Sequence, residues 1–160
     1  MSNLGIIFAV LGMALAALLP GWGSAKGVGM AGQAGAGVLA DNPSLFSKVL
    51  VLQLLPATQG IYGFLIAVIA MGNIGISGGD FNMSIAKGLA YLGACLPIAV
   101  VGFISAIHQA KTSIASMQLI SKRPDQFGKS MLFPVMVEMY AILAVLVSFI
   151  AVNGVAGMAL

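Results

Sequence analysis

The chain has 160 residues, of which 60% are hydrophobic and 7% charged, and its formal net charge is +3 at pH 7. Its mean hydropathy of +1.07 is typical of a membrane protein and excludes an ordinary soluble globular domain. The small positive charge comes from a handful of residues and does not indicate nucleic acid as a partner.

Four apolar stretches are long enough to cross a bilayer, for which about 20 residues suffice. In chain order they cover residues 4–39, 45–78, 85–120 and 127–157. Lys26 is the first basic residue of the chain, so the basic region of a signal peptide is missing and we expect the first stretch to be retained. The sequence therefore predicts an all-α membrane protein with four transmembrane helices.

The first predicted helix carries small residues at steps of four, namely Gly23, Gly27, Ala31 and Gly35. In a membrane, such residues let helix backbones approach closely. A helix pair within one subunit could use this face, and so could a crowded inner layer of an assembly. The large number of glycines on this helix favours the inner layer.

The second half of the chain repeats the first at a constant offset in residue number. The matching pairs are Gly21/Gly102, Ser24/Ser105, Ala25/Ala106, Pro43/Pro124, Phe46/Phe127 and Lys48/Lys129. Each half contains one helix, a short polar tip with a proline, and a second helix, because proline disfavours helical geometry at the residue before it. The sequence thus predicts two tandem duplicated α-hairpins that point the same way, residues 1–80 and 81–160.

The distribution of basic residues predicts the orientation of the hairpins. Four of them cluster at the two tips, namely Lys48, Lys122, Arg123 and Lys129, whereas the opposite side has Lys87. Cytoplasmic loops carry an excess of Lys and Arg. We therefore expect the hairpin tips to be cytoplasmic and both termini to lie outside.

Glu138 is the only glutamate of the chain, and no other charge interrupts residues 131–152 around it. A carboxylate in hydrocarbon is costly without a partner, so its default interpretation is an ion or proton site. The repeat pairs Glu138 with Ala57 in the first hairpin. The first hairpin therefore lacks this carboxylate, and we expect one site per chain.

Three other polar residues are predicted to lie at the depth of Glu138. Gln109 and Glu138 precede and follow Pro124 at nearly equal spacings along the chain, and Thr58 and Gln59 follow Pro43 at almost the same spacing. At about 1.5 Å per helical residue, all four lie roughly 21–24 Å from the tips. Buried polar groups at one level must satisfy one another or a ligand.

The second predicted helix presents Leu55, Thr58, Gln59 and Tyr62 on one face. Pro56 has no N–H, and the resulting kink could turn the Leu55 carbonyl towards a ligand. Hydroxyl, amide, carbonyl and carboxylate oxygens suit a hard cation, and a single carboxylate balances a monovalent one. This surplus of oxygens favours Na⁺ over H⁺, with Tyr62 donating a hydrogen bond to Glu138. The alternative is a polar cluster that only joins helices.

Three other signals do not indicate sites. Residues 27–32 match G-x-G-x-x-G but follow no strand, so we expect no nucleotide to be bound by this chain. Lys26 lies near the depth of Glu138. The repeat pairs Gln109 with Val28, and Lys26 lies on about the opposite side of the first predicted helix from Val28. His108 is expected to point away from the face of Gln109, and neither residue is expected to be a ligand.

The chain resembles the proteolipid subunit, called c or K, of rotary V-type ATPases in its double-hairpin form. Residues 23–30, 52–63 and 137–143 carry the resemblance, which extends over essentially the whole chain. It is closest to the bacterial members that translocate Na⁺. In that group the ion is held by the residues that match the Leu55 carbonyl, Thr58, Gln59, Gln109 and Glu138, and the residue that matches Tyr62 supports them.

The resemblance implies a non-catalytic subunit that assembles with identical copies into a rotor ring, in a bacterial plasma membrane. The predicted helices of residues 4–39 and 85–120 would form the inner layer, and those of residues 45–78 and 127–157 the outer layer. The partners would be a stator subunit with an essential arginine, central-stalk subunits at the cytoplasmic tips, and lipid. One alternative is the same rotor carrying H⁺. A channel or transporter is another, although duplicated parallel hairpins argue against the inverted repeats of many transporters.

Overall fold

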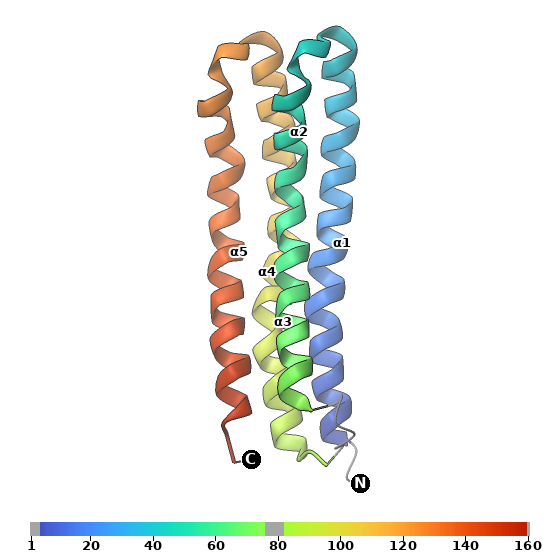
Figure 1. Cartoon of the computed structure of the whole chain (residues 1–160), viewed down its shortest axis with the longest axis vertical. Coiled ribbons are helices and arrows are strands. Elements are labelled where there is room, and N and C mark those ends of the chain that lie inside the picture. The colour runs from blue at the N-terminus through green and yellow to red at the C-terminus, as the bar shows by residue number, and fades with distance from the viewer. Residues whose placement is uncertain (1–3, 76–81, 160) are drawn as a thin grey trace.

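The computed structural model describes residues 4–75 and 82–159, which form a bundle of long helices lying side by side (Figure 1). Helix α1 spans Leu4–Asp41 and α4 spans Ile85–Lys122. Helices α2 (Phe46–Leu54) and α3 (Thr58–Ile74) together make one interrupted span, and α5 covers Phe127–Ala156. Four segments are long and apolar enough to cross a membrane, which confirms the predicted all-helical membrane fold.

The two hairpin tips lie together at one end of the bundle (Figure 1). Each begins with a proline and forms a short 3-10 helix, Pro43–Leu45 in the first hairpin and Pro124–Gln126 in the second. Lys48 of the first hairpin donates a hydrogen bond from Nζ to the carbonyl oxygen of Pro124, at 2.7 Å. The two hairpins therefore point the same way, and this bond joins their tips.

Helix α3 ends earlier than the 45–78 stretch predicts. Its last residue is Ile74, because Gly75 follows with φ of +73° and ends the helix in the left-handed conformation that glycine adopts readily. Residues 76–78 lie outside the described part of the chain, and so does the expected boundary between the halves at residues 80 and 81.

Helices α1 and α4 pack backbone against backbone. A Cβ atom on Gly12 would lie 2.6 Å from the Cα atom of Leu92, and one on Gly23 would lie 2.7 Å from the carbonyl oxygen of Phe103. These separations are too short for any side chain at either glycine. The close approach expected from the small residues of the first helix is therefore used inside one chain.

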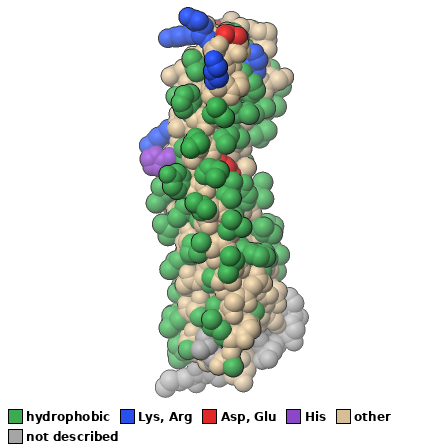
Figure 2. All heavy atoms as spheres, turned by 90° about the vertical axis from the view of Figure 1, so that its left-hand side faces the viewer, with side chains coloured by type: hydrophobic (Ala, Val, Ile, Leu, Met, Phe, Trp, Pro, Cys, Tyr) green, Lys and Arg blue, Asp and Glu red, His purple; other side chains and the backbone are tan. Residues whose placement is uncertain are grey.

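Helix α3 packs against α1, α5 packs against α4, and α3 and α5 also contact each other. Large hydrophobic side chains point outward along the bundle, with Phe64 63%, Tyr140 66% and Ile150 69% exposed. Figure 2 shows such side chains along one face, with most of the visible Lys and Arg side chains at the end where the tips lie. A surface of this kind suits lipid, whereas the buried polar side chains of Gln59, Gln109 and Glu138 come together from α3, α4 and α5.

Candidate ion-binding site

Glu138 projects from α5 towards α3 and α4 and is only 8% exposed. Its Oε2 accepts hydrogen bonds from Thr58 Oγ1 at 2.8 Å, Gln109 Nε2 at 2.7 Å and Gln59 Nε2 at 3.3 Å. Its Oε1 accepts from the Tyr62 hydroxyl at 2.7 Å. These four donors satisfy a buried carboxylate, but none of them carries a positive charge. An ionised Glu138 would therefore need a bound cation or a proton to balance its charge.

Several oxygen atoms crowd around the Thr58 hydroxyl. Its Oγ1 lies 2.9 Å from the Leu55 carbonyl oxygen, 3.4 Å from Gln59 Oε1 and 2.8 Å from Glu138 Oε2. A hydroxyl has one proton and can donate to only one of these three acceptors at a time. The remaining oxygens face each other with no proton from Thr58 between them. Such a cluster of carbonyl, amide, hydroxyl and carboxylate oxygens has the chemistry of a hard-cation site.

Pro56 shapes the backbone of this site. The helical span breaks there into α2 and α3, which are separated by a 3-10 turn over Leu55–Ala57. Thr58 donates its backbone N–H to the Leu55 carbonyl, so hydroxyl and carbonyl are held side by side. In the second hairpin Pro134 lies inside α5, which runs unbroken from Phe127 to Ala156. Where the sequence predicts a kink at Pro56, the structure has a 3-10 turn, and it occurs in the hairpin that supplies Leu55, Thr58, Gln59 and Tyr62.

A pair of buried glutamines joins α3 to α4. Gln59 donates from Nε2 to Gln109 Oε1, and both side chains are fully buried. The bond fixes which way the two amides point and directs Gln59 Oε1 towards Thr58. The sequence predicts one depth for the two glutamines, and two buried amides at a shared level are a signal for such a pair.

The structure thus brings together every residue that the sequence predicts for the site, namely Leu55, Thr58, Gln59, Tyr62, Gln109 and Glu138. Their assignment as ion ligands stays a prediction. Within residues 4–75 and 82–159, no group of three His, Cys, Asp or Glu side chains is placed to hold a metal ion. The oxygen cluster with its single carboxylate is therefore the candidate site.

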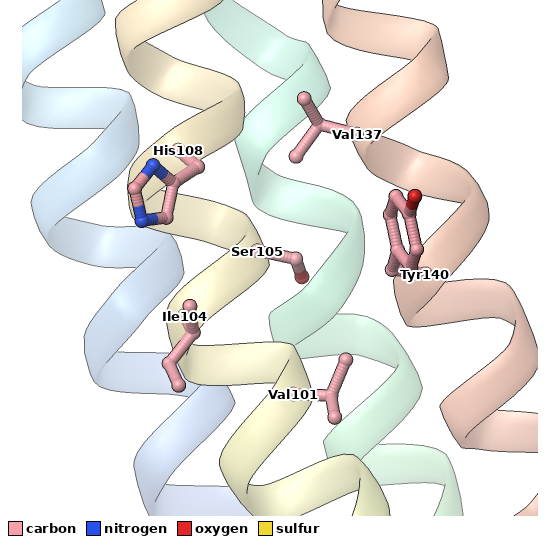
Figure 3. Close-up of a pocket in the computed structure, with 6 residues that line it drawn as sticks. All are labelled: Val101, Ile104, Ser105, His108, Val137 and Tyr140. Carbon is pink, nitrogen blue, oxygen red and sulfur yellow. The ribbon is translucent and has the colours of Figure 1, made fainter.

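Lys26 and His108 are exposed, and the donors to Glu138 are Thr58, Gln59, Tyr62 and Gln109. His108 lines an open, mostly apolar groove between α4 and α5. Figure 3 shows Ile104, Ser105 and His108 on the α4 side of this groove and Tyr140 on the α5 side. The groove lies beside the candidate site but contributes no oxygen to the cluster around Thr58.

Comparison with known proteins agrees with the duplication. Residues 11–70 and 92–151 each match the family of the ATP synthase C subunit, and the second match repeats the first at the offset of the internal repeat. The V-type sodium ATPase subunit K of Enterococcus hirae is 47% identical over 150 residues, which cover 94% of this chain and 93% of the relative. The A-type ATP synthase subunit K of Methanocaldococcus jannaschii is 34% identical over 150 residues, or 94% of this chain and 64% of the relative.

Four membrane-spanning helices in two duplicated hairpins, a buried glutamate in the second hairpin, and family matches in both halves agree with one another. The chain therefore belongs to the family of the ATP synthase C subunit, among the V-type ATPase proteolipid subunits K, which are rotor-ring subunits of a rotary ATPase and are not themselves catalytic.

Proposed function

We propose that this rotor subunit binds one Na⁺ at Glu138 and carries it across the membrane as the ring turns. The observation that supports this most strongly is the oxygen cluster around Thr58, where one hydroxyl proton is shared among three acceptors. The relative from Enterococcus hirae is named a sodium ATPase subunit, which adds support from sequence similarity. The proposed ligands are the Leu55 carbonyl, Thr58, Gln59, Gln109 and Glu138, with Tyr62 as a supporting donor.

The charge of the cluster favours a monovalent cation. One carboxylate with neutral oxygens compensates one positive charge, whereas a divalent ion would be left undercompensated in a low-dielectric environment. The Gln59 amide oxygen already lies beside Thr58, whereas the Gln109 amide would exchange its bond with Gln59 to turn its carbonyl oxygen towards a bound ion. The Tyr62 hydroxyl, 2.7 Å from Glu138 Oε1, would hold the carboxylate in place.

The carrier cycle follows from the cost of an unpaired carboxylate in lipid. Glu138 with its ion bound is electrically neutral and can face hydrocarbon as the ring rotates. An arginine of the stator subunit would attract the carboxylate and release the ion into a half-channel. Moving one charge against the membrane potential requires about 2.3 kcal/mol per 100 mV, which ATP hydrolysis in other subunits would supply.

The orientation of the subunit is also part of the proposal. The basic tip residues favour a cytoplasmic position for the tips, where they would contact the central stalk. The membrane would be a bacterial plasma membrane. Helices α1 and α4 would form the inner layer of the ring, and α2, α3 and α5 the outer layer. The hairpin of residues 1–80 would carry no ion because Ala57 replaces the carboxylate, so each chain would transport one ion.

The second candidate is the same rotor carrying H⁺. A protonated Glu138 needs only one or two hydrogen-bond partners, and the Tyr62 and Gln109 side chains already lie at 2.7 Å from its two oxygens. The Leu55 carbonyl and the Gln59 amide oxygen would then have no role in transport. The two candidates therefore differ in whether these extra oxygens matter.

Carbodiimide labelling of the purified ring separates the two candidates, because the reagent reacts with a protonated carboxyl group. At a fixed pH we expect millimolar Na⁺ to slow the labelling of Glu138 and the same concentration of K⁺ to leave it unchanged. The variant Glu138→Gln identifies the labelled residue and should give no signal. Protection by raised pH alone would show a proton carrier, and an unreactive Glu138 would contradict the ion-carrier proposal altogether.

A further inference from the structure

The first turn of α3 supplies most of the groups that hold Glu138. Thr58, Gln59 and Tyr62 donate three of the four hydrogen bonds to its carboxylate. This turn begins directly after the 3-10 break at Pro56. The dihedral angles stay helical through this turn, with Ala57 at φ −81° and ψ −23°. A side-chain oxygen can still accept from an N–H in the first turn of an α-helix, but the methyl group of Ala57, the residue before α3, cannot accept.

A serine on another helix takes this capping role. Gly60 in the first turn of α3 donates its backbone N–H to Ser24 Oγ of α1, at 2.8 Å. Ser24 is only 6% exposed, so water does not compete freely for the bond. A Cβ atom on Gly60 would lie 3.2 Å from Ser24 Oγ and 3.5 Å from the Cα atom of Gly21. The glycine therefore lets α1 come close enough for the hydroxyl to reach the backbone of α3.

The bond lies next to the candidate ligands in the chain. Gly60 follows Gln59 directly and lies between Thr58 and Tyr62, so the turn that Ser24 anchors is the turn that presents their side chains. On its other side this turn is held by Glu138. A bound ion would have to be enclosed between a fixed α3 backbone and a movable carboxylate, and the Ser24 bond fixes that backbone.

The second hairpin provides an internal comparison. The repeat pairs Ser24 with Ser105, and Gly60 with Ala141. Ser105 donates its hydroxyl to the Gly102 carbonyl of its own helix, at 3.3 Å. Helix α5 runs unbroken past Ala141, so it has no helix start there to cap. The same serine position thus binds another helix only in the hairpin where the span is interrupted.

We propose that Ser24 is a positioning residue of the ion site. Its hydroxyl anchors the first turn of α3 and so sets the places of Thr58, Gln59 and the neighbouring Leu55 carbonyl around the ion. It acts through that backbone and does not touch the ion. The inference rests on the proposed Na⁺ function, and it adds that the affinity of the site depends on a contact with α1.

Ser24→Ala in the assembled ring tests the proposal, with Ser105→Ala as the matched control. We expect Ser24→Ala to raise the Na⁺ concentration that half-protects Glu138 from carbodiimide by about 3- to 30-fold, as for the loss of a helix cap or a supporting partner of an ion ligand. Ser105→Ala should leave this concentration unchanged. The thermal midpoint of both rings is measured as well, because a serine with only a structural role would lower the midpoint without changing half-protection.

A second variant keeps the test decisive if Ser24→Ala does not assemble. Gly60→Ala places a Cβ atom 3.2 Å from Ser24 Oγ, so it should weaken Na⁺ protection through the same contact. In the double variant with Ser24→Ala, Gly60→Ala should raise the half-protecting Na⁺ concentration by less than it does alone, because both changes remove the same contact. Normal Na⁺ protection in Ser24→Ala, or in Gly60→Ala where Ser24→Ala does not assemble, would overturn the positioning role. A wild-type ring that Na⁺ does not protect would instead refute the sodium proposal itself.

Discussion

At the scale of single residues, the groups around Glu138 have different chemical roles. Thr58 approaches Oε2 and lies beside two further oxygens, so its hydroxyl oxygen would itself be a ligand. Tyr62 approaches Oε1 and lies outside that cluster, so it would act as a hydrogen-bond donor. Loss of a ligand oxygen and loss of a supporting donor should therefore weaken ion binding by different amounts.

The pair Thr58→Val and Tyr62→Phe measures this difference, since each removes a hydroxyl and nearly preserves shape. We expect Thr58→Val to raise the half-protecting Na⁺ concentration by roughly 10- to 100-fold. Tyr62→Phe should raise it by about tenfold or less, because it removes one hydrogen bond of about 1.5–3 kcal/mol to a charged group, part of which the other donors replace. The readout is Na⁺ protection from carbodiimide at fixed pH. Equal effects would contradict the division of roles, and no effect of Thr58→Val would favour the proton carrier.

At the scale of helices, two devices set the geometry of the bundle. Glycines let α1 and α4 pack backbone to backbone, and Pro56 interrupts the second span so that α3 starts at the level of the site. In lipid there is no hydrophobic drive between helices, so close packing of this kind provides much of their association. The glycines that touch α4 should therefore tolerate substitution far less than the glycines that touch nothing.

Gly12→Ala and Gly29→Ala form a matched pair on α1. A Cβ atom on Gly12 would lie 2.6 Å from the Leu92 Cα atom, whereas one on Gly29 would meet no atom within 4 Å. We expect Gly12→Ala to destabilise the protein by about 1–3 kcal/mol, as overpacking does. Gly29→Ala should be neutral or stabilise by up to about 1 kcal/mol, because alanine favours helix more than glycine.

The measurement for this pair is the loss of helical circular dichroism as sodium dodecyl sulfate is added to the detergent-solubilised protein. A fall in the midpoint for Gly12→Ala, with an unchanged or higher midpoint for Gly29→Ala, is the expected pattern. Equal midpoints for both variants would mean that the α1 and α4 backbones do not approach as closely in solution as in the structure.

At the scale of the whole molecule, duplication has produced two hairpins of similar fold and unequal chemistry. Both hairpins point the same way, and their tips are joined by the bond from Lys48 to Pro124. The buried carboxylate of Glu138 belongs to the second hairpin, and the matching residue of the first hairpin is Ala57. The first hairpin instead contributes uncharged polar groups around Glu138 from its interrupted span. The two halves are therefore complementary parts of one candidate site.

Single cysteines test the proposed orientation of the protein in the membrane. In a Cys95→Ala background, Ser44→Cys reports on the first tip and Ala159→Cys on the opposite end, and both residues are exposed. A membrane-impermeant maleimide should label Ser44→Cys in inside-out vesicles and Ala159→Cys in right-side-out vesicles. Labelling after detergent treatment controls for accessibility, and the opposite pattern would reverse the assigned topology.

The sequence by itself determined the number and order of the spans, the duplication and the central place of Glu138. Composition, a repeat offset and an isolated charge are properties of the linear sequence and do not depend on the fold. It also placed Thr58, Gln59 and Gln109 at the level of Glu138, because an α-helix has a fixed rise per residue and the prolines mark both tips. Family membership followed from the same residues and agrees with the matches in both halves.

Only the tertiary structure decided which atoms meet at that level. The bond between Gln59 and Gln109, the crowding of oxygens at Thr58 and the bond from Gly60 to Ser24 depend on how each helix is rotated about its axis. They depend equally on the 3-10 turn at Pro56, which changes the rotation of α3 relative to α2. Counting residues along a helix gives the depth of each side chain and shows which side chains share a face. It does not give the direction of that face, which is set by the packing of α1, α3, α4 and α5 against one another.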